Sequence, residues 1–160
     1  MVFWQNDIPP RSFKVLDPSM LEDILGLRQA VLHPHGPPQR VTYAQDLHPR
    51  TLHIGAFEGA KLVGVGTLIP EDEDEVLSER IFRIRGMAVL PEFQGSGIGH
   101  TLLEMMFNHL IDNEPKAEMI WCNARISALN LYTSFGFKIH GAEFDIPGSG
   151  PHKRLRRIWT

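Results

Sequence analysis

Three glycines at alternate positions, Gly95, Gly97 and Gly99, stand immediately before a run with helical apolar spacing. The first turn of a helix has N–H groups without intrahelical partners, and the helix dipole adds about half a positive charge there. Glycines carry no Cβ atom that would keep a phosphate away from these donors. The pattern is therefore typical of a pyrophosphate site, although a tight turn without a ligand would explain the same residues.

Two common nucleotide sites do not match this turn. A Walker A loop requires a lysine followed by serine or threonine in register, and neither is present. A dinucleotide fold requires G-x-G-x-x-G, but after Gly95 and Gly97 the third position is His100. That fold also expects an acidic residue at a strand end, whereas Glu114 and Glu118 fall in a predicted connection. Nucleotide hydrolysis and hydride transfer are therefore disfavoured.

Other groups that could do chemistry give weaker signals. His33 and His35 stand beside prolines, as is common in loops, so we predict no metal site. Cys122 lies in a predicted buried strand without an adjacent base, which favours core packing over nucleophilic catalysis. The acidic run PEDEDEVLSER is interpreted as a solvated loop, with steering of a cationic amine as the alternative.

The composition is that of a globular chain. It has 160 residues, of which 42% are hydrophobic and 22% charged, and we expect one domain over residues 1–160. A formal net charge of -3 argues against nucleic-acid binding. One cysteine excludes an internal disulfide, and neither a signal peptide in MVFWQNDIPP nor a membrane span is predicted. We therefore expect a cytoplasmic protein.

The elements that must position the glycine turn follow from the hydrophobic patterns. Strands are predicted over 12–17, 51–58, 61–69, 81–90, 119–124, 137–144 and 154–159. Helices are predicted over 20–32, 97–113 and 127–135, the first capped by Asp17 or Ser19 and the last by Ser127, with Gly136 ending it. The apolar stripe of the second helix comprises Leu102, Leu103, Met106, Phe107, Leu110 and Ile111.

This order predicts an α+β fold with a mixed, mostly antiparallel sheet flanked by helices. A hairpin is expected at Glu58 and Gly59, and short parallel pairing where helices intervene. Gly86 interrupts an alternating strand, which suggests a bulge or a close backbone approach.

Two motifs in these elements resemble those of the GCN5-related N-acetyltransferases, the GNAT family. The segment MAVLPEFQGSGIGHTLL resembles V-x-P-x-x-[RQ]-x-x-G-x-[GA] through Val89, Pro91, Gln94, Gly97 and Gly99. The segment ARISALNLYTSFGF resembles A-x-x-[LF]-Y-x-x-x-G-F through Ala128, Leu131, Tyr132, Gly136 and Phe137. The order of elements also resembles the fold of that family from about residue 12 onward. The last hairpin is similar to that of small uncharacterised members with Gly-x-Pro-His, here Gly150, Pro151 and His152.

The resemblance implies acetyl transfer from acetyl-CoA to a primary amine by direct attack in a ternary complex. The residues it implies for holding CoA are Met87, Ala88 and Val89 along the pantetheine arm, and Gln94, Gly95, Ser96, Gly97, Ile98, Gly99 and His100 around the pyrophosphate. A backbone N–H near Val89 would stabilise the charge on the thioester oxygen. The bulge at Gly86 would help to separate its strand from the one over 119–124.

Tyr132 is the general acid that the resemblance implies. The CoA thiol has a pKa of about 8.5 and a tyrosine phenol a pKa of about 10, so proton delivery from Tyr132 to the sulfur needs no large pKa shift. A half-buried aromatic packed against Phe135 is the alternative, and a tyrosine here can also position the sulfur without being essential.

The base that deprotonates the amine is less well defined. Ribosomal-protein acetyltransferases of this family carry a glutamate where Ile120 stands and an asparagine where Arg125 stands, which argues against that activity here. His152 is the first candidate, because the last hairpin borders the acceptor pocket in this family. The other candidates are His53, Asp46 and Glu92, acting directly or through water.

The acceptor and the partners are left open. The acceptor is a small-molecule amine, a polyamine or antibiotic, or a peptide or protein amine, and a homodimer is also left open. A non-catalytic acyl-CoA-binding sensor or subunit is the rival function. The third alternative is a purely structural domain whose glycine turn binds no ligand.

Overall fold

The computed structural model describes residues 10–159, so the expectation about a signal peptide falls almost wholly outside the described residues. Within this range the strands are β1 (Arg11–Leu16), β2 (Leu52–Glu58), β3 (Lys61–Ile69), β4 (Ile81–Val89), β5 (Met119–Arg125), β6 (Lys138–Ile146) and β7 (Gly150–Ile158). The α-helices there are α1 (Leu21–Leu32), α2 (Ile98–Asn113) and α3 (Leu129–Ser134). None of the helices in the described part is long and apolar enough to cross a membrane.

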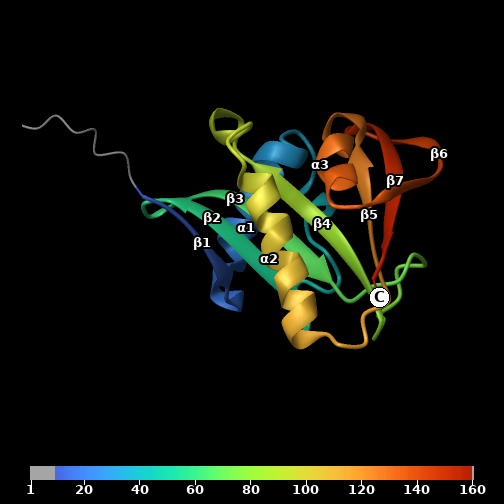
Figure 1. Cartoon of the computed structure of the whole chain (residues 1–160). Helices are drawn as coiled ribbons and strands as arrows, with labels where there is room; N and C mark the ends of the chain where they lie inside the picture. Colours follow the sequence, from blue (N-terminus) through green and yellow to red (C-terminus); the bar gives the residue numbers. More distant parts are fainter. Residues whose placement is uncertain (1–9, 160) are drawn as a thin grey trace, which may run out of the picture.

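The strands form one sheet in the order β1-β2-β3-β4-β5-β7-β6 (Figure 1). Every neighbouring pair is antiparallel except β4 and β5, which are parallel. The chain passes through α2 between β4 and β5, as a parallel connection requires. The predicted α+β fold with a mostly antiparallel sheet is confirmed.

The two long helices cover opposite faces of the sheet, with α2 in front and α1 behind in Figure 1. The larger core lies under α2 and includes Ile54, Leu103 and Ile120, and the smaller one lies under α1 and includes Ile24 and Val65. Below, the α2 face and the α1 face denote these two sides of the sheet.

The predicted stripe of α2 is correct except at its last residue. Leu102, Leu103, Met106 and Leu110 are buried, but Ile111 is 65% exposed. Phe107 lies at the edge of the stripe, where the rings of Phe135 and Trp159 cover it. Ile111 lies one turn further along that edge.

The helix ends agree only in part with the predicted caps. Asp17 accepts a hydrogen bond from the N–H of Ser19, but it caps the short 3-10 turn before α1 rather than α1 itself. Ser127 is not a cap, because it lies inside a 3-10 turn (Ile126–Ala128) that continues into α3. Gly136 ends α3 as predicted, with a φ of 85°.

β4 and β5 pair only over their first residues and then separate. The pairs are Ile81 with Met119, Phe82 with Ile120 and Arg83 with Trp121. Beyond them Gly86 has a φ of 66°, and the register between β3 and β4 shifts at this point. The predicted bulge is confirmed. A Cβ atom at Gly86 would also lie 2.7 Å from Nε of Arg28, so both the backbone and the packing require glycine.

The acidic run is not a solvated loop in its first half. Glu71 is 4% exposed and binds Arg83 at 2.9 Å, and its carbonyl accepts a hydrogen bond from the Trp121 indole. Glu73 pairs with both Arg154 and Arg156. The loop is held against the sheet because three arginines, all on strands, neutralise its carboxylates. Sequence patterns alone do not indicate these pairings.

Candidate active site

The glycine turn forms a row of free backbone donors. Among residues 10–159, no protein group accepts a hydrogen bond from any N–H between Gly95 and His100, and the first intrahelical bond runs from Thr101 to the Gly97 carbonyl at 3.1 Å. Gly95 and Gly97 have φ values of 76° and 87°. Only glycine adopts such a conformation readily. The backbone conformation therefore requires glycine at these positions, in addition to the space that a ligand would need.

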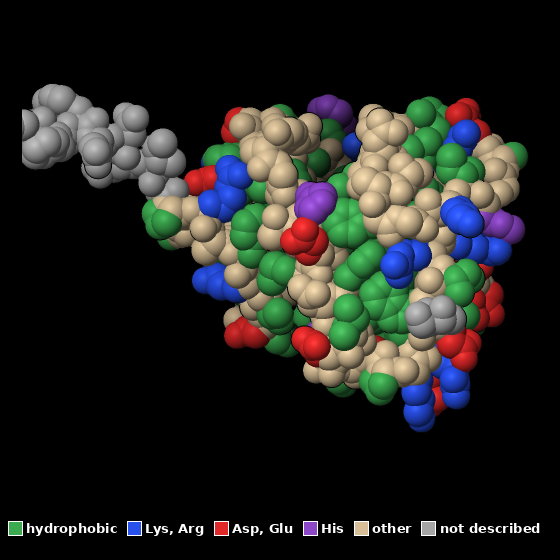
Figure 2. Space-filling model, in the orientation of Figure 1, with side chains coloured by type: hydrophobic (Ala, Val, Ile, Leu, Met, Phe, Trp, Pro, Cys, Tyr) green, Lys and Arg blue, Asp and Glu red, His purple; other side chains and the backbone are tan. Residues whose placement is uncertain are grey.

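The space above this turn is open. A Cβ atom built on Gly95 or Gly97 would meet no atom within 4 Å, whereas one on Gly99 would lie 3.2 Å from Leu131 of α3. Figure 2 shows a recess at the top of the molecule, between the N-terminus of α2 and α3. The donors therefore border a surface that an anion can reach.

Side chains around the turn fix its shape. Gln94 donates to the Val89 carbonyl at 2.9 Å, and Ser96 donates to the Phe93 carbonyl at 2.5 Å. Arg11, on the distant β1, donates to the Ser96 carbonyl at 3.4 Å. The sequence analysis missed Arg11, since only the sheet order brings β1 near this turn.

The free edge of β4 leads directly into the turn. Leu90 donates to the Val63 carbonyl of β3, and the register pairs Val89 with Gly64 and Ala88 with Val65. Hydrogen-bonding groups alternate in direction along a strand, so those of Ala88 also point to β3. Those of Met87 and Val89 then point to the gap beside β5. Of the three residues predicted to pair with pantetheine, Met87 thus has both backbone groups free on this side within the described part of the chain, and Val89 has its N–H, since the Val89 carbonyl accepts from Gln94.

Tyr132 of α3 is 5% exposed and belongs to the core on the α2 face. Its ring packs edge-on against Phe137 at 5.6 Å, not against Phe135 as the alternative interpretation expected. Burial, with a smaller contribution from Cys122, raises the pKa of Tyr132 well above its usual value near 10. The hydroxyl of Tyr132 therefore keeps its proton at neutral pH and can act as a hydrogen-bond donor.

Cys122 is buried beside Tyr132, and burial raises the pKa of its thiol. A thiol in this state is not a nucleophile. The prediction of core packing is confirmed for Cys122.

His152 lies on the α1 face at the start of β7, opposite Arg125 in the register. Its Nδ1 is 2.8 Å from the Gly150 carbonyl, which accepts from an Nδ1–H. The neutral ring then carries its lone pair on Nε2, which can accept a proton. The ring of Phe144 stacks against it with the centroids 6.1 Å apart. His152 thus has a ring nitrogen without a partner among the described residues, on the strand next to β5.

The other candidate bases have structural contacts or lie elsewhere. His53 uses both ring nitrogens, with Thr67 and with the Asp46 carbonyl, each at 2.8 Å. The Asp46 carboxylate binds the buried Arg28 at 2.9 Å and accepts from the Tyr43 N–H. Burial is the main cause that lowers the pKa of His53. Glu92 is exposed in the 3-10 turn before the glycines.

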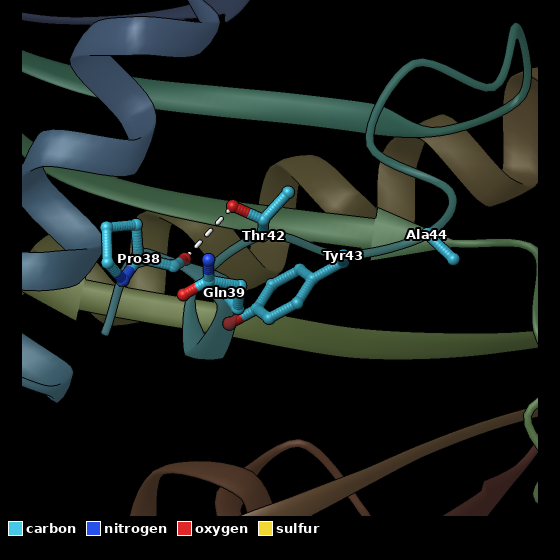
Figure 3. Close-up of a pocket in the computed structure, with 5 residues that line it drawn as sticks. All are labelled: Pro38, Gln39, Thr42, Tyr43 and Ala44. Carbon is cyan, nitrogen blue, oxygen red and sulfur yellow. Dashed lines mark hydrogen bonds between the residues drawn. The ribbon is translucent and has the colours of Figure 1, made fainter. Parts of the chain in front are cut away.

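The α1 face of the gap carries an open pocket that the sequence analysis did not identify. Its volume is about 360 Å³, and its lining is Pro38, Gln39, Thr42, Tyr43 and Ala44. Figure 3 shows the Tyr43 ring pointing from this loop toward the strands, while Thr42 bonds back to the Pro38 carbonyl. The Arg85 guanidinium of β4 lies 4.0 Å from the centre of the Tyr43 ring. Residues 10–159 contain no cluster of three or more His, Cys, Asp or Glu that could hold a metal ion.

Comparison with known proteins agrees with this geometry. Residues 30–149 match the sequence model of the family described as "Acetyltransferase (GNAT) domain". A curated protein of Bacillus subtilis, "Uncharacterized N-acetyltransferase YitI", is 30% identical over 132 residues, which is 82% of this chain and 87% of that protein.

Solved structures share the fold. Escherichia coli ElaA superposes with a TM-score of 0.76 at 22% identity, over 92% of this chain and 99% of that one. The Escherichia coli ribosomal-protein-S18-alanine N-acetyltransferase superposes with a TM-score of 0.71 at 17% identity, over 93% and 94% of the two chains.

Proposed function

The chain belongs to the GCN5-related N-acetyltransferase family, and on that premise we propose that it moves an acetyl group from acetyl-CoA to a primary amine by direct attack in a ternary complex. The observation that carries this proposal is the continuity of two sets of free backbone groups. The free edge of β4 at Met87 and Val89 leads into the unpaired N–H groups from Gly95 to His100. An extended amide-containing arm that ends in a pyrophosphate matches this arrangement.

The chain supplies mainly backbone groups to acetyl-CoA. The N–H groups from Gly95 to His100 hold the pyrophosphate at the positive end of α2. The backbone groups of Met87 bind the pantetheine arm as an added strand. The Val89 N–H faces the thioester oxygen, where negative charge grows during attack, while the Val89 carbonyl is held by Gln94.

Tyr132 and His152 act from opposite sides of the sheet. On the α2 face, the Tyr132 hydroxyl donates a hydrogen bond to the departing sulfur. Because its pKa is raised, it stabilises the thiolate as a donor more readily than it gives up its proton. On the α1 face, Nε2 of His152 takes the proton from the amine, directly or through water. The reaction requires no metal, and we place it in the cytoplasm, where acetyl-CoA is available.

The rival function is a non-catalytic acyl-CoA sensor. Both functions predict binding of acetyl-CoA and of free CoA in calorimetric titration, with no binding of NAD. They differ in whether free CoA thiol is released when a panel of primary amines is added. Amine-dependent thiol release supports the transferase, and binding without any release supports the sensor. No binding of either CoA form would refute both.

Two variants connect the activity to this site. Tyr132→Phe removes one hydroxyl that has no protein partner among residues 10–159, so stability is unchanged and kcat falls by about 10²–10⁴-fold. His152→Gln removes the base that accepts the amine proton, so kcat/KM falls while binding of acetyl-CoA is unchanged. Arg80→Gln, which changes an exposed arginine outside the gap, is the matched control for both. An unchanged kcat in Tyr132→Phe would refute its assigned role.

A further inference from the structure

The α1 face between β4, β5 and β7 carries an excess of positive charge. Residues alternate along a strand, so the register places Arg83 and Arg85 of β4, Arg125 of β5, and Arg154 and Arg156 of β7 on this one face. The carboxylates that reach it come from the acidic loop.

These carboxylates are used by the arginines furthest from the opening. Glu71 and Glu75 pair with Arg83, at 2.9 and 3.5 Å. Glu73 pairs with Arg154 and Arg156, at 3.1 and 2.6 Å. The end of the face where β4 and β5 are still paired is therefore neutralised.

Arg85 and Arg125 form no ion pair with a carboxylate of residues 10–159. Arg125 donates only to neutral oxygens, the Leu32 carbonyl and the Ser149 hydroxyl, and no acceptor is recorded for its Nη1. Arg85 has no protein acceptor in the described part of the chain and lies over the Tyr43 ring. Both arginines thus have donors available to a ligand.

Their positions place these donors on the two sides of the gap. Parallel pairing ends at Arg83 and Trp121, so continued pairing would put Arg85 level with Asn123 and Met87 level with Arg125. The strands separate there instead, which leaves Arg85 on one side of the gap and Arg125 on the other. His152 is opposite Arg125 on the next strand.

Arg85 is half-buried and forms no direct ion pair within residues 10–159; burial, followed by repulsion from Arg83, lowers its pKa, while Tyr43, Glu71 and Glu75 act in the opposite direction. An arginine nevertheless stays charged at neutral pH, because its usual pKa lies far above neutrality. An incoming anion would restore the missing partner. The planar guanidinium presents two parallel N–H groups that match the two oxygens of a carboxylate.

We propose that Arg85, assisted by Arg125, binds a carboxylate of the acceptor, so that the acceptor is a small amine that also carries a carboxylate, such as an amino acid. This assignment rests on the proposed acetyl transfer at the adjacent gap. It disfavours polyamines and polycationic antibiotics, which the two free arginines would repel.

The test compares pairs of amines that differ only in the carboxylate. Thiol release from acetyl-CoA is measured with β-alanine and β-alaninamide, with L-phenylalanine and L-phenylalaninamide, and with putrescine. The expected kcat/KM is higher for each acid than for its amide by at least about tenfold, as a charged hydrogen bond allows. Equal values within each pair, or a preference for putrescine, would overturn the carboxylate site and leave acetyl transfer standing.

Variants of Arg85 test whether this residue causes the preference for the acid over its amide. Arg85→Gln raises the KM of the acid at least about tenfold but leaves the KM of the amide and of acetyl-CoA unchanged. Arg85→Lys keeps the charge without the two parallel donors and recovers part of the preference. Arg80→Gln, the exposed arginine outside the gap, keeps the full preference. An intact preference in Arg85→Gln would overturn the assignment.

A binding measurement separates this inference from the proposed function. L-phenylalanine and L-phenylalaninamide are titrated into protein saturated with free CoA, which needs no turnover. If no amine is acetylated, the transferase proposal fails. The carboxylate site can still be tested, because it predicts that L-phenylalanine binds, that L-phenylalaninamide does not, and that Arg85→Gln abolishes the binding of L-phenylalanine. Absence of such binding would overturn the site as well.

Discussion

A negative charge placed in the glycine turn provides a sharp test of the pyrophosphate site. In Gly97→Glu the new side chain enters open space, because a Cβ atom there meets no neighbour within 4 Å. Gly97→Gln has nearly the same size and shape without the charge. Both variants force an L-residue into a φ of 87°, which costs each about 1–2 kcal/mol of stability. The ratio of their dissociation constants for acetyl-CoA therefore isolates the charge.

The expected ratio follows from Coulomb's law. A carboxylate at residue 97 and one phosphate charge about 6 Å away repel by about 0.7 kcal/mol in water and about 2.8 kcal/mol at an effective dielectric constant of about 20. Since about 1.4 kcal/mol corresponds to a factor of ten, the Glu variant binds about 3-fold to 100-fold more weakly than the Gln variant.

Calorimetric titration with acetyl-CoA measures the ratio of the two dissociation constants at low salt and at about 1 M salt, where the charge repulsion is screened. The Debye length falls from about 10 Å at 0.1 M to about 3 Å at 1 M, so the ratio approaches one at high salt. Gly141→Glu is the matched control, because Gly141 has a φ of 84° and equally open surroundings but lies on β6. Equal affinity of the Glu and Gln variants at low salt would refute the assignment of the pyrophosphate to this turn.

Three further predictions concern the framework of the gap. Gly86→Ala destabilises the fold by at least about 1–2 kcal/mol in urea unfolding, because φ is positive and Arg28 is in contact; a change below about 0.5 kcal/mol would contradict the strained bulge. Asp46→Asn leaves the charge of Arg28 buried without a counter-ion and costs about 3–5 kcal/mol in the same assay, and a near-neutral effect would contradict the buried pair. Burial lowers the pKa of His53 in the folded state, so the unfolded state takes up a proton first and stability falls as the pH drops below about 6.5. His53→Gln reduces that slope and His35→Gln, an exposed histidine, does not; equal slopes would contradict the prediction.

The parts of the site that the sequence predicts are those in which backbone conformation depends on local residues. Gly95 and Gly97 indicate a turn with positive φ before a helix, and Gly86 indicates a bulge, because few other residues adopt these conformations. The positions of the strands along the chain follow from alternating apolar residues. Ser127 fails as a predicted cap because a 3-10 turn and an α-helix share the same local signals at their first residues.

The parts that the sequence does not predict depend on which strands become neighbours. Glu71 and Glu73 read as a solvated acidic run, yet their partners are 12 to 83 residues away in the chain. Arg11 reaches the glycine turn across 85 residues. His53 remained a candidate base until its contacts with Thr67 and Asp46 showed that both ring nitrogens are used. Long-range pairing of charges leaves no periodic signal, so it appears only once the sheet is assembled.

The separation of β4 from β5 accounts for both halves of the proposed reaction. On the α2 side it leaves Met87 and Val89 of β4 without a partner strand, which frees backbone groups for an extended arm. On the α1 side Arg85 lies just beyond the last paired residue, Arg83, and the direct ion pairs of Glu71 and Glu75 are with Arg83 rather than with Arg85. A single bulge at Gly86 thus creates a neutral slot and a cationic one back to back. If the acceptor is an amino acid, a competing carboxylate placed on β5 by Asn123→Asp, where the Asn123 oxygen already accepts from Arg154, should lower kcat/KM for the acid and spare its amide, while binding of acetyl-CoA stays unchanged. A loss of acetyl-CoA binding in that variant would show instead that both slots belong to one ligand.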